Sequence, residues 1–182
     1  MPSLNIEEVV RGAIDGDKEA FGILYEEYFT PIYRFIYFRV KNRTDAEDIS
    51  QNVFIKAYSS IGNYKEHGVP FLAWLYTIAR NTTIDYWKKK RDYLLENPDT
   101  IAERVVDLNN NIERENERQD ARSAVVGAIR ELSEDQQEVI ILRHLEERTY
   151  LEIAELLGKS EVALRALNSR ATKVLRKSLK EY

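Results

Sequence analysis

The sequence contains no cysteine, which excludes disulfide bonds and thiolate metal sites. Seven glycines, four prolines and almost no alternation of apolar with polar residues leave little support for strands and hairpins. The composition therefore predicts an all-helical fold. No apolar run approaches the roughly 20 residues that span a bilayer, and the first residues do not form a signal peptide. We therefore expect a cytoplasmic protein without membrane insertion.

An excess of basic residues is also missing, because the formal net charge of the 182 residues is −4. Any contact with nucleic acid must therefore be local. Acidic residues are concentrated in the segment 92–120, which also contains Pro98 and the run of three asparagines at 109–111. This composition is typical of a linker. We expect two small helical domains, 1–91 and 121–182, joined by this acidic segment.

The clearest local pattern begins at Thr149. Thr149 and Glu152 have the spacing of a capping box. Gly158 is suited to ending that helix, and Ser160 to capping the next one. The pattern predicts a helix-turn-helix within a four-helix C-terminal domain, in which Ser133 and Gln136 begin an earlier helix. The free face of the last helix can enter the major groove of DNA, and its candidate contacts are Arg165, Ser169, Arg170, Lys173 and Arg176.

A second unusual face is predicted within the helix that follows Thr44, where Glu47 has the spacing of another capping box. Ile55 lies at the centre of the outer face of this helix, among acidic residues, with Phe54 and Tyr58 beside it. Apolar residues grouped on a surface mark interaction sites. We expect a docking patch for a protein with a basic surface. Upstream, the pair 30–31 (Thr-Pro) predicts the start of a new helix.

The helix predicted from Phe71 to Arg91 has aromatic residues and arginines on its outer face. That face contains Tyr76, Arg80, Thr83, Trp87 and Arg91, and ends in the lysine run 88–90. Rings beside cations suit opened nucleic acid, because bases stack on rings while phosphates meet the charges. The alternative is that neighbouring elements cover these rings. The preceding loop adds four residues able to stack or hydrogen-bond: Asn63, Tyr64, Lys65 and His67.

Three motifs in this order resemble a bacterial RNA polymerase sigma factor of the extracytoplasmic-function type. They are DAEDISQNVFIKAY (45–58), PFLAWLYTIARNTTIDYWKKKR (70–91) and LSEDQQEVIILRHLEERTYLEIAELLGKSEVALRALNSRA (132–171). The resemblance implies that the first motif binds the β′ clamp helices of core RNA polymerase, through Glu47, Asp48, Gln51, Asn52, Phe54 and Ile55. It implies that the loop and the 76–91 stripe, including Lys88, melt the minus-ten element and capture its bases.

The same resemblance implies that the C-terminal domain reads the minus-thirty-five element, with Arg143 added to the contacts of the last helix, and that it meets the polymerase β flap. Anti-sigma factors are typical partners of the family, although no residue here identifies one. We expect no catalytic residue, metal or cofactor. His67 and the carboxylates of 45–48 match no metal-ligand spacing. Two alternatives are a dimeric helix-turn-helix repressor and a hydrolase that uses the carboxylates of 45–48.

Overall fold

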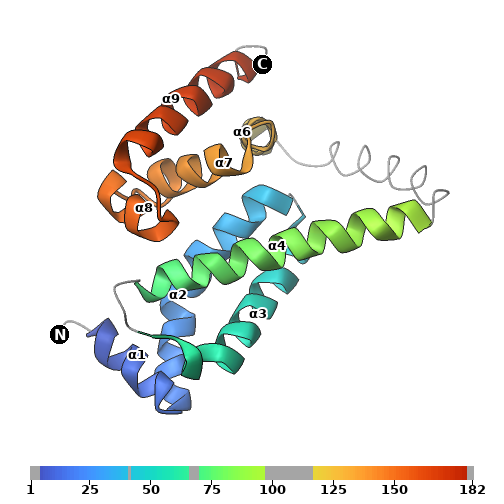
Figure 1. Ribbon diagram of the computed structural model, residues 1–182. Helices are drawn as coiled ribbons and strands as arrows, with labels where there is room; N and C mark the ends of the chain where they lie inside the picture. The colour runs from blue at the N-terminus through green and yellow to red at the C-terminus, as the bar shows by residue number, and fades with distance from the viewer. Residues whose placement is uncertain (1–4, 41, 66–69, 97–116, 180–182) are drawn as a thin grey trace.

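A computed structural model describes residues 5–40, 42–65, 70–96 and 117–179. All regular structure in these ranges is helical and forms two domains, as the composition predicted (Figure 1). The N-terminal domain consists of α1 (Ile6–Ile14), α2 (Lys18–Val40), α3 (Arg43–Ser60), the 3₁₀ turn η1 (Ile61–Asn63) and α4 (Phe71–Glu96). The C-terminal domain consists of α6 (Glu117–Arg130), α7 (Glu134–Ile140), the π-helical turn η2 (Ile141–Leu145), α8 (Tyr150–Leu157) and α9 (Glu161–Ser178).

The N-terminal domain is built around α2, which contacts α1, α3 and α4. Leu24, Ile32 and Phe35 of α2 are fully buried. Pro31 lies inside this helix, so the prediction that a helix begins there is wrong. Proline removes one backbone hydrogen bond from a helix. Buried residues on both sides of Pro31 belong to the same core, and this packing favours one continuous helix.

The start of α3 also differs from the prediction. Asn42, not Thr44, is the N-cap, and its Oδ1 accepts a hydrogen bond from the backbone N–H of Asp45 at 2.9 Å. Glu47 accepts a hydrogen bond from Nε of Arg43 at 2.9 Å instead of closing a capping box. Asparagine is at least as good an N-cap as threonine, and the earlier residue gives the longer helix.

The C-terminal domain packs α9 against α6, α7 and α8. The predicted start of α7 is confirmed, because the backbone N–H of Ser133 donates to Oε1 of Gln136 at 3.1 Å. Ile153 of α8 and Leu164 of α9 are fully buried in one apolar cluster, and buried Ala171 of α9 packs in another with Ile129 of α6 and Ile140 of α7. None of the described helices combines the length and the apolar character needed to cross a bilayer.

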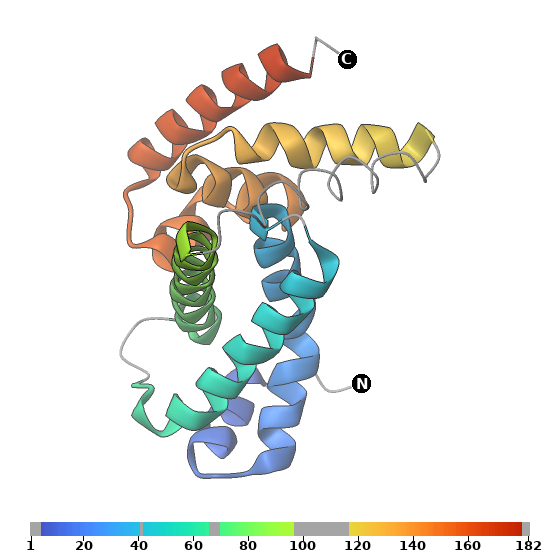
Figure 2. The same cartoon turned by 90° about the vertical axis from the view of Figure 1, so that its right-hand side faces the viewer.

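The two domains are packed together. Figures 1 and 2 both show the C-terminal domain lying over α2 and α4, with the N-terminal end of α2 and the end of α3 on the far side. Helix α4 contacts α8, while α2 contacts α6 and η2. Buried Leu142 and Ile153 of the C-terminal domain belong to the same apolar core as Leu75 and Tyr76 of α4. Helices α4 and α6 also extend into the predicted linker from both ends.

Candidate protein and nucleic-acid interfaces

The helix-turn-helix has the predicted local geometry. Oγ1 of Thr149 accepts from the backbone N–H of Glu152 at 3.2 Å, and the backbone N–H of Thr149 donates to the Glu152 carboxylate at 2.7 Å. The hydrogen bond from the Thr149 backbone N–H to the carboxylate, and a second one from the Thr149 hydroxyl at 2.8 Å, lower the pKa of Glu152. Gly158 adopts the left-handed conformation (φ 63°), and Oγ of Ser160 accepts from the N–H of Ala163 at 3.3 Å. The corner between α8 and α9 is therefore fixed by capping and by a glycine in the left-handed region.

The free face of α9 carries the predicted cations. The side chains of Arg165, Ser169, Arg170, Lys173 and Arg176 are all exposed. The guanidinium of Arg165 lies 4.4 Å from the ring centre of Tyr150, and that of Arg143 lies 5.3 Å from the same ring. Nη1 of Arg143 also donates to the carbonyl of Arg148 at 2.8 Å. Tyr150, which the sequence analysis did not single out, therefore brings two predicted DNA contacts together at the start of α9.

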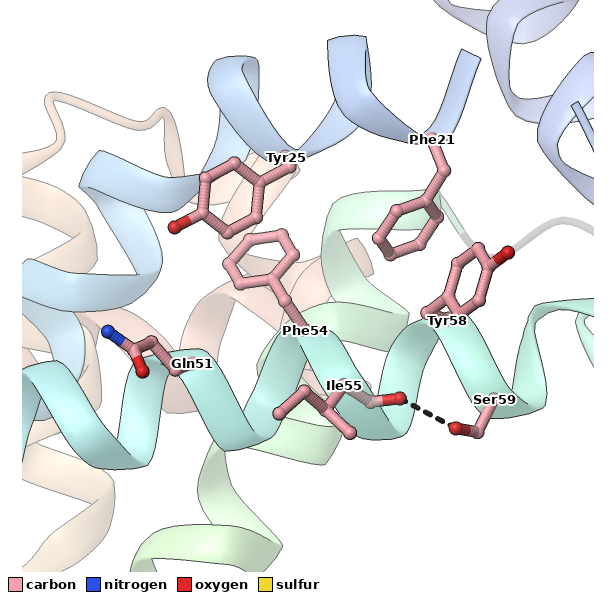
Figure 3. A pocket seen from close by; sticks show the side chains of 7 residues that line it. All are labelled: Phe21, Tyr25, Gln51, Phe54, Ile55, Tyr58 and Ser59. Atoms are coloured by element: carbon pink, nitrogen blue, oxygen red, sulfur yellow. Dashed lines mark hydrogen bonds between the residues drawn. The ribbon is translucent and has the colours of Figure 1, made fainter. Parts of the chain in front are cut away.

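On the opposite side of the molecule, α2 and α3 form an apolar groove of about 400 Å³ (Figure 3). Ile55 at its edge is 62% exposed. The groove is lined by Phe21, Tyr25, Gln51, Phe54, Ile55, Tyr58 and Ser59. Phe21 and Tyr25 were not predicted to belong to this surface, although their spacing of four residues places both on one face of a helix.

Aromatic contacts shape this α2/α3 groove. The rings of Tyr25 and Phe54 meet edge to face at 4.8 Å, and those of Phe21 and Tyr58 at 5.0 Å. Phe54 is buried, so the prediction that it stands on the outer surface is wrong. Position 54 lies about 100° from Ile55 around the helix, which turns Phe54 toward α2. It forms the floor of the groove and not its rim.

Polar residues flank the groove along α3. Asp48, Gln51 and Asn52 are exposed, and Glu47 is half-buried beside Arg43. Asp45 instead faces α4, where its Oδ2 accepts from the hydroxyl of Tyr86 at 2.5 Å and from Nζ of Lys90 at 3.3 Å. The acidic face around Ile55 is therefore available to a partner, whereas Asp45 connects two helices.

The prediction that one face of α4 is exposed along its whole length is wrong for two of its residues. Tyr76 is 1% exposed and Thr83 is 3% exposed. Trp87, Lys88 and Arg91 are exposed, as expected. For Tyr76 the alternative hypothesis is therefore correct: neighbouring elements cover its ring. The cover comes from the C-terminal domain, whose residues Glu146 and Arg148 lie close enough to act on the pKa of Tyr76, which burial raises.

The loop before α4 is described only in part. Asn63 and Lys65 are exposed. Tyr64 is half-buried, and its ring lies 5.5 Å from that of Phe71 and 5.2 Å from that of Trp74. His67 lies outside the described residues. The structure thus places Asn63 and Lys65 where a ligand can reach them and packs Tyr64 against the start of α4.

A charged cluster lies where the two domains meet. Glu138 of α7 is 2% exposed and binds two arginines of the N-terminal domain. Arg80 of α4 donates from Nε to Oε1 at 2.6 Å and from Nη2 to Oε2 at 3.0 Å. Nη2 of Arg39 in α2 donates to Oε1 at 2.8 Å. Burial lowers the pKa of Arg39, while the negative charge of Glu138 acts in the opposite direction. A buried carboxylate is thus compensated by two guanidiniums.

Beside this cluster lies a cavity of about 680 Å³ with a basic lining. Its cations are Arg39, Arg80, Lys88, Arg91 and Arg130. Arg130 of α6 donates from Nη2 to the carbonyls of Arg39 (3.2 Å) and Val40 (3.1 Å), and its guanidinium lies 5.5 Å from the ring centre of Trp87. The predicted stripe on α4 therefore lines an interdomain cavity here.

Comparisons with known families match both domains. Sigma-70 region 2 matches residues 24–93, and sigma-70 region 4 matches residues 122–175. The ECF RNA polymerase sigma factor BldN of Streptomyces coelicolor is 36% identical over 181 residues, covering 97% of this chain and 67% of BldN. SigW of Bacillus subtilis, also an ECF RNA polymerase sigma factor, is 29% identical over 183 residues and covers 97% of both chains.

Solved structures share the fold. CnrH in complex with the cytosolic domain of CnrY gives a TM-score of 0.67 at 24% identity, covering 95% of this chain and 96% of CnrH. The sigma factor RpoE, in complex with the anti-sigma factor NepR from Bartonella quintana, gives a TM-score of 0.60 at 23% identity, covering 88% of this chain and 96% of RpoE. Two matched regions in order, and a relative at 36% identity along nearly the whole chain, show that this protein belongs to the ECF RNA polymerase sigma factors, the non-enzymatic initiation factors that direct RNA polymerase to promoters.

Proposed function

We propose that the α2/α3 groove is where this sigma factor binds the β′ clamp helices of core RNA polymerase. The observation that carries the proposal is the side chain of Ile55, which is 62% exposed at the edge of an aromatic groove. Asp48 and Gln51, exposed beside it, offer a carboxylate and an amide to a basic partner. An apolar centre with a polar rim is the usual composition of a protein interface.

We propose further that the domains divide promoter recognition between them in the cytoplasm. Residues 1–91 bind polymerase and open the minus-ten element, and 121–182 read the minus-thirty-five element and meet the β flap. The segment 92–120 connects them. The support for the second assignment is the exposed basic face of α9, with Arg143 and Arg165 held on the ring of Tyr150. The support for assigning the minus-ten element to residues 1–91 is the exposed ring of Trp87, with the exposed cations Lys88 and Arg91 near it.

An inhibitory protein is a further partner that we propose. CnrH was solved with the cytosolic domain of CnrY, and RpoE with the anti-sigma factor NepR. The α2/α3 groove offers an inhibitor of this chain an apolar surface on which it would compete with polymerase.

The substitution Ile55→Asp tests the docking proposal. A charge at the edge of the groove must be desolvated when a partner covers it, so affinity for core polymerase should fall at least about tenfold, which equals about 1.4 kcal/mol. Fluorescence anisotropy of the labelled chain, titrated with core enzyme, measures this affinity. Ile23→Asp is the matched control, because Ile23 is exposed on α2 but does not line the groove. Equal affinities for the two variants, with both folded by circular dichroism, would exclude the groove as the docking site.

A further inference from the structure

The contact between the domains uses the geometry of a phosphate site. Arg80 binds both oxygens of the Glu138 carboxylate, at 2.6 and 3.0 Å, and Arg39 binds one of them from a second helix. A guanidinium that grips two oxygens in this way is equally suited to a carboxylate and to a phosphate. Glu138 is therefore positioned where an oxyanion would bind the N-terminal domain.

Further cations of the N-terminal domain lie in the cavity next to Arg39 and Arg80. Lys88 and Arg91 line the same cavity from α4, beside the exposed ring of Trp87. The N-terminal domain thus presents a continuous row of cations with one aromatic ring, which is suited to a nucleic-acid strand. The negative charge at the buried end of this row comes from the other domain, through Glu138.

We propose that this structure is a self-masked state, in which Glu138 occupies the place that a DNA phosphate takes on Arg39 and Arg80 once the C-terminal domain has moved away. The inference rests on the proposed DNA-binding role of α4 and adds two things to it. It assigns Arg39 as a backbone contact, and it makes Glu138 the residue that holds the domains closed.

The balance of charges explains why Glu138 controls closure. A buried carboxylate and two guanidiniums are tolerated together because each compensates the other. The substitution Glu138→Gln leaves Arg39 and Arg80 facing a neutral amide, so the closed state loses its charge compensation. In the open state the same arginines are exposed to solvent or bound to phosphate. Glutamine therefore favours opening without changing the shape of the side chain.

Distance measurements test closure directly. The chain has no cysteine, so Asn81→Cys and Lys177→Cys, at exposed positions of α4 and α9, allow two spin labels on the full chain. We expect Glu138→Gln to move the distance distribution to longer values. Glu155→Gln is the control, since it removes the same charge from an exposed position of α8 that does not line the interdomain cavity. A distribution unchanged by Glu138→Gln, or changed equally by Glu155→Gln, would overturn the proposal.

Binding to DNA tests the masking. A fluorescein-labelled single-stranded 20-mer of mixed sequence serves as the probe, because phosphate contacts do not depend on sequence. We expect Glu138→Gln to bind at least fivefold more tightly than the native chain, because less free energy is spent on separating the domains. The logarithmic salt slope then reports the phosphate contacts of the open state. Adding Arg39→Gln to this variant should make the slope shallower by about 0.7. An affinity unchanged by Glu138→Gln would contradict masking, and a slope unchanged by Arg39→Gln would refute the phosphate site.

A reversible cross-link gives an independent arm that leaves Glu138 in place. Nη1 of Arg34 and Oε1 of Glu146 lie 3.5 Å apart across the domain contact. Cysteines at these two positions, joined by a bis-methanethiosulfonate reagent, should reduce binding of the 20-mer at least fivefold, and reduction should restore it. Undiminished binding by the cross-linked chain would contradict masking. These readouts involve no polymerase, so they are independent of the α2/α3 groove.

Discussion

At the scale of single residues, Tyr76 has a buried hydroxyl that finds no hydrogen-bond partner among the described residues. Its ring packs edge to face on Phe35 at 4.9 Å, and burial raises its pKa. An unsatisfied buried hydroxyl destabilises the state that contains it by about 1–3 kcal/mol. The closed structure therefore accommodates the ring of Tyr76 better than its polar end.

We predict that Tyr76→Phe increases the free energy of unfolding by about 1 kcal/mol, because the ring contacts remain and the buried hydroxyl is removed. Urea unfolding followed by circular dichroism measures the change. Tyr86→Phe is the matched control. The hydroxyl of Tyr86 donates to Asp45 at 2.5 Å, so its removal should decrease stability. Destabilisation by Tyr76→Phe as large as that by Tyr86→Phe would show that the Tyr76 hydroxyl has a stabilising partner.

Arg165 supports a second prediction at this scale. Its guanidinium lies on Tyr150 and pairs with Glu161 at 3.2 Å, at the start of α9. If this end of the helix faces base edges, Arg165→Ala should reduce discrimination between native and altered minus-thirty-five elements by about 1–3 kcal/mol. Competition binding with holoenzyme measures the discrimination, and Arg176→Ala, near the other end of α9, is the comparison. A loss that is uniform across sequences would identify Arg165 as a phosphate contact instead.

At the scale of elements, the cap of α8 depends on an ionised carboxylate. The pKa of Glu152 is lowered in the folded protein, first by the backbone N–H of Thr149. Its stabilising contribution is therefore complete above the pKa of an unfolded glutamate, about 4.3, and is lost as the pH falls through the lower folded value. Below that pH the carboxyl is neutral and caps less well.

We predict that Thr149→Ala lowers the free energy of unfolding by about 1 kcal/mol at pH 7. It removes the hydroxyl that accepts from the Glu152 N–H and donates to the Glu152 carboxylate at 2.8 Å. The difference from the native chain should narrow below about pH 4, where both lose the charged carboxylate. Urea unfolding at pH 7 and pH 3.5 compares the two chains. A constant difference would mean that the Thr149 hydroxyl gains nothing from the charge of the Glu152 carboxylate.

The sequence predicts those features that depend on interactions between residues close together in the chain. Thr149, Gly158 and Ser160 act within a few residues of their own helix ends, and their roles were predicted correctly. Asn42 and Thr44 are both good caps two residues apart, so local preference could not choose between them. Tyr76 and Thr83 depend on a domain some 60 residues further along the chain. Helix α4 has apolar residues on more than one face, and no local pattern identifies which face meets that domain.

At the scale of the whole molecule, the two candidate surfaces differ in accessibility. The α2/α3 groove lies away from the C-terminal domain and is open, with Ile55 exposed at its edge (Figures 1 and 3). Arg80 on α4 is half-buried and is bound by Glu138 of α7. If the groove binds polymerase as proposed, polymerase can bind the closed chain. If Arg80 contacts DNA as proposed, the closed state and promoter binding exclude each other.

These two proposals together give a prediction for the labelled chain. Core polymerase should lengthen the distance between labels at Asn81→Cys and Lys177→Cys, because it favours the state whose DNA-binding surfaces are uncovered. Ile55→Asp, which disables the groove, should abolish the lengthening at the same polymerase concentration, whereas Ile23→Asp should leave it intact. A holoenzyme that keeps the short distance would show that the domains stay packed during initiation. In that case Trp87 and Arg80 would have to meet DNA from within the closed structure, where Arg80 is already bound to Glu138.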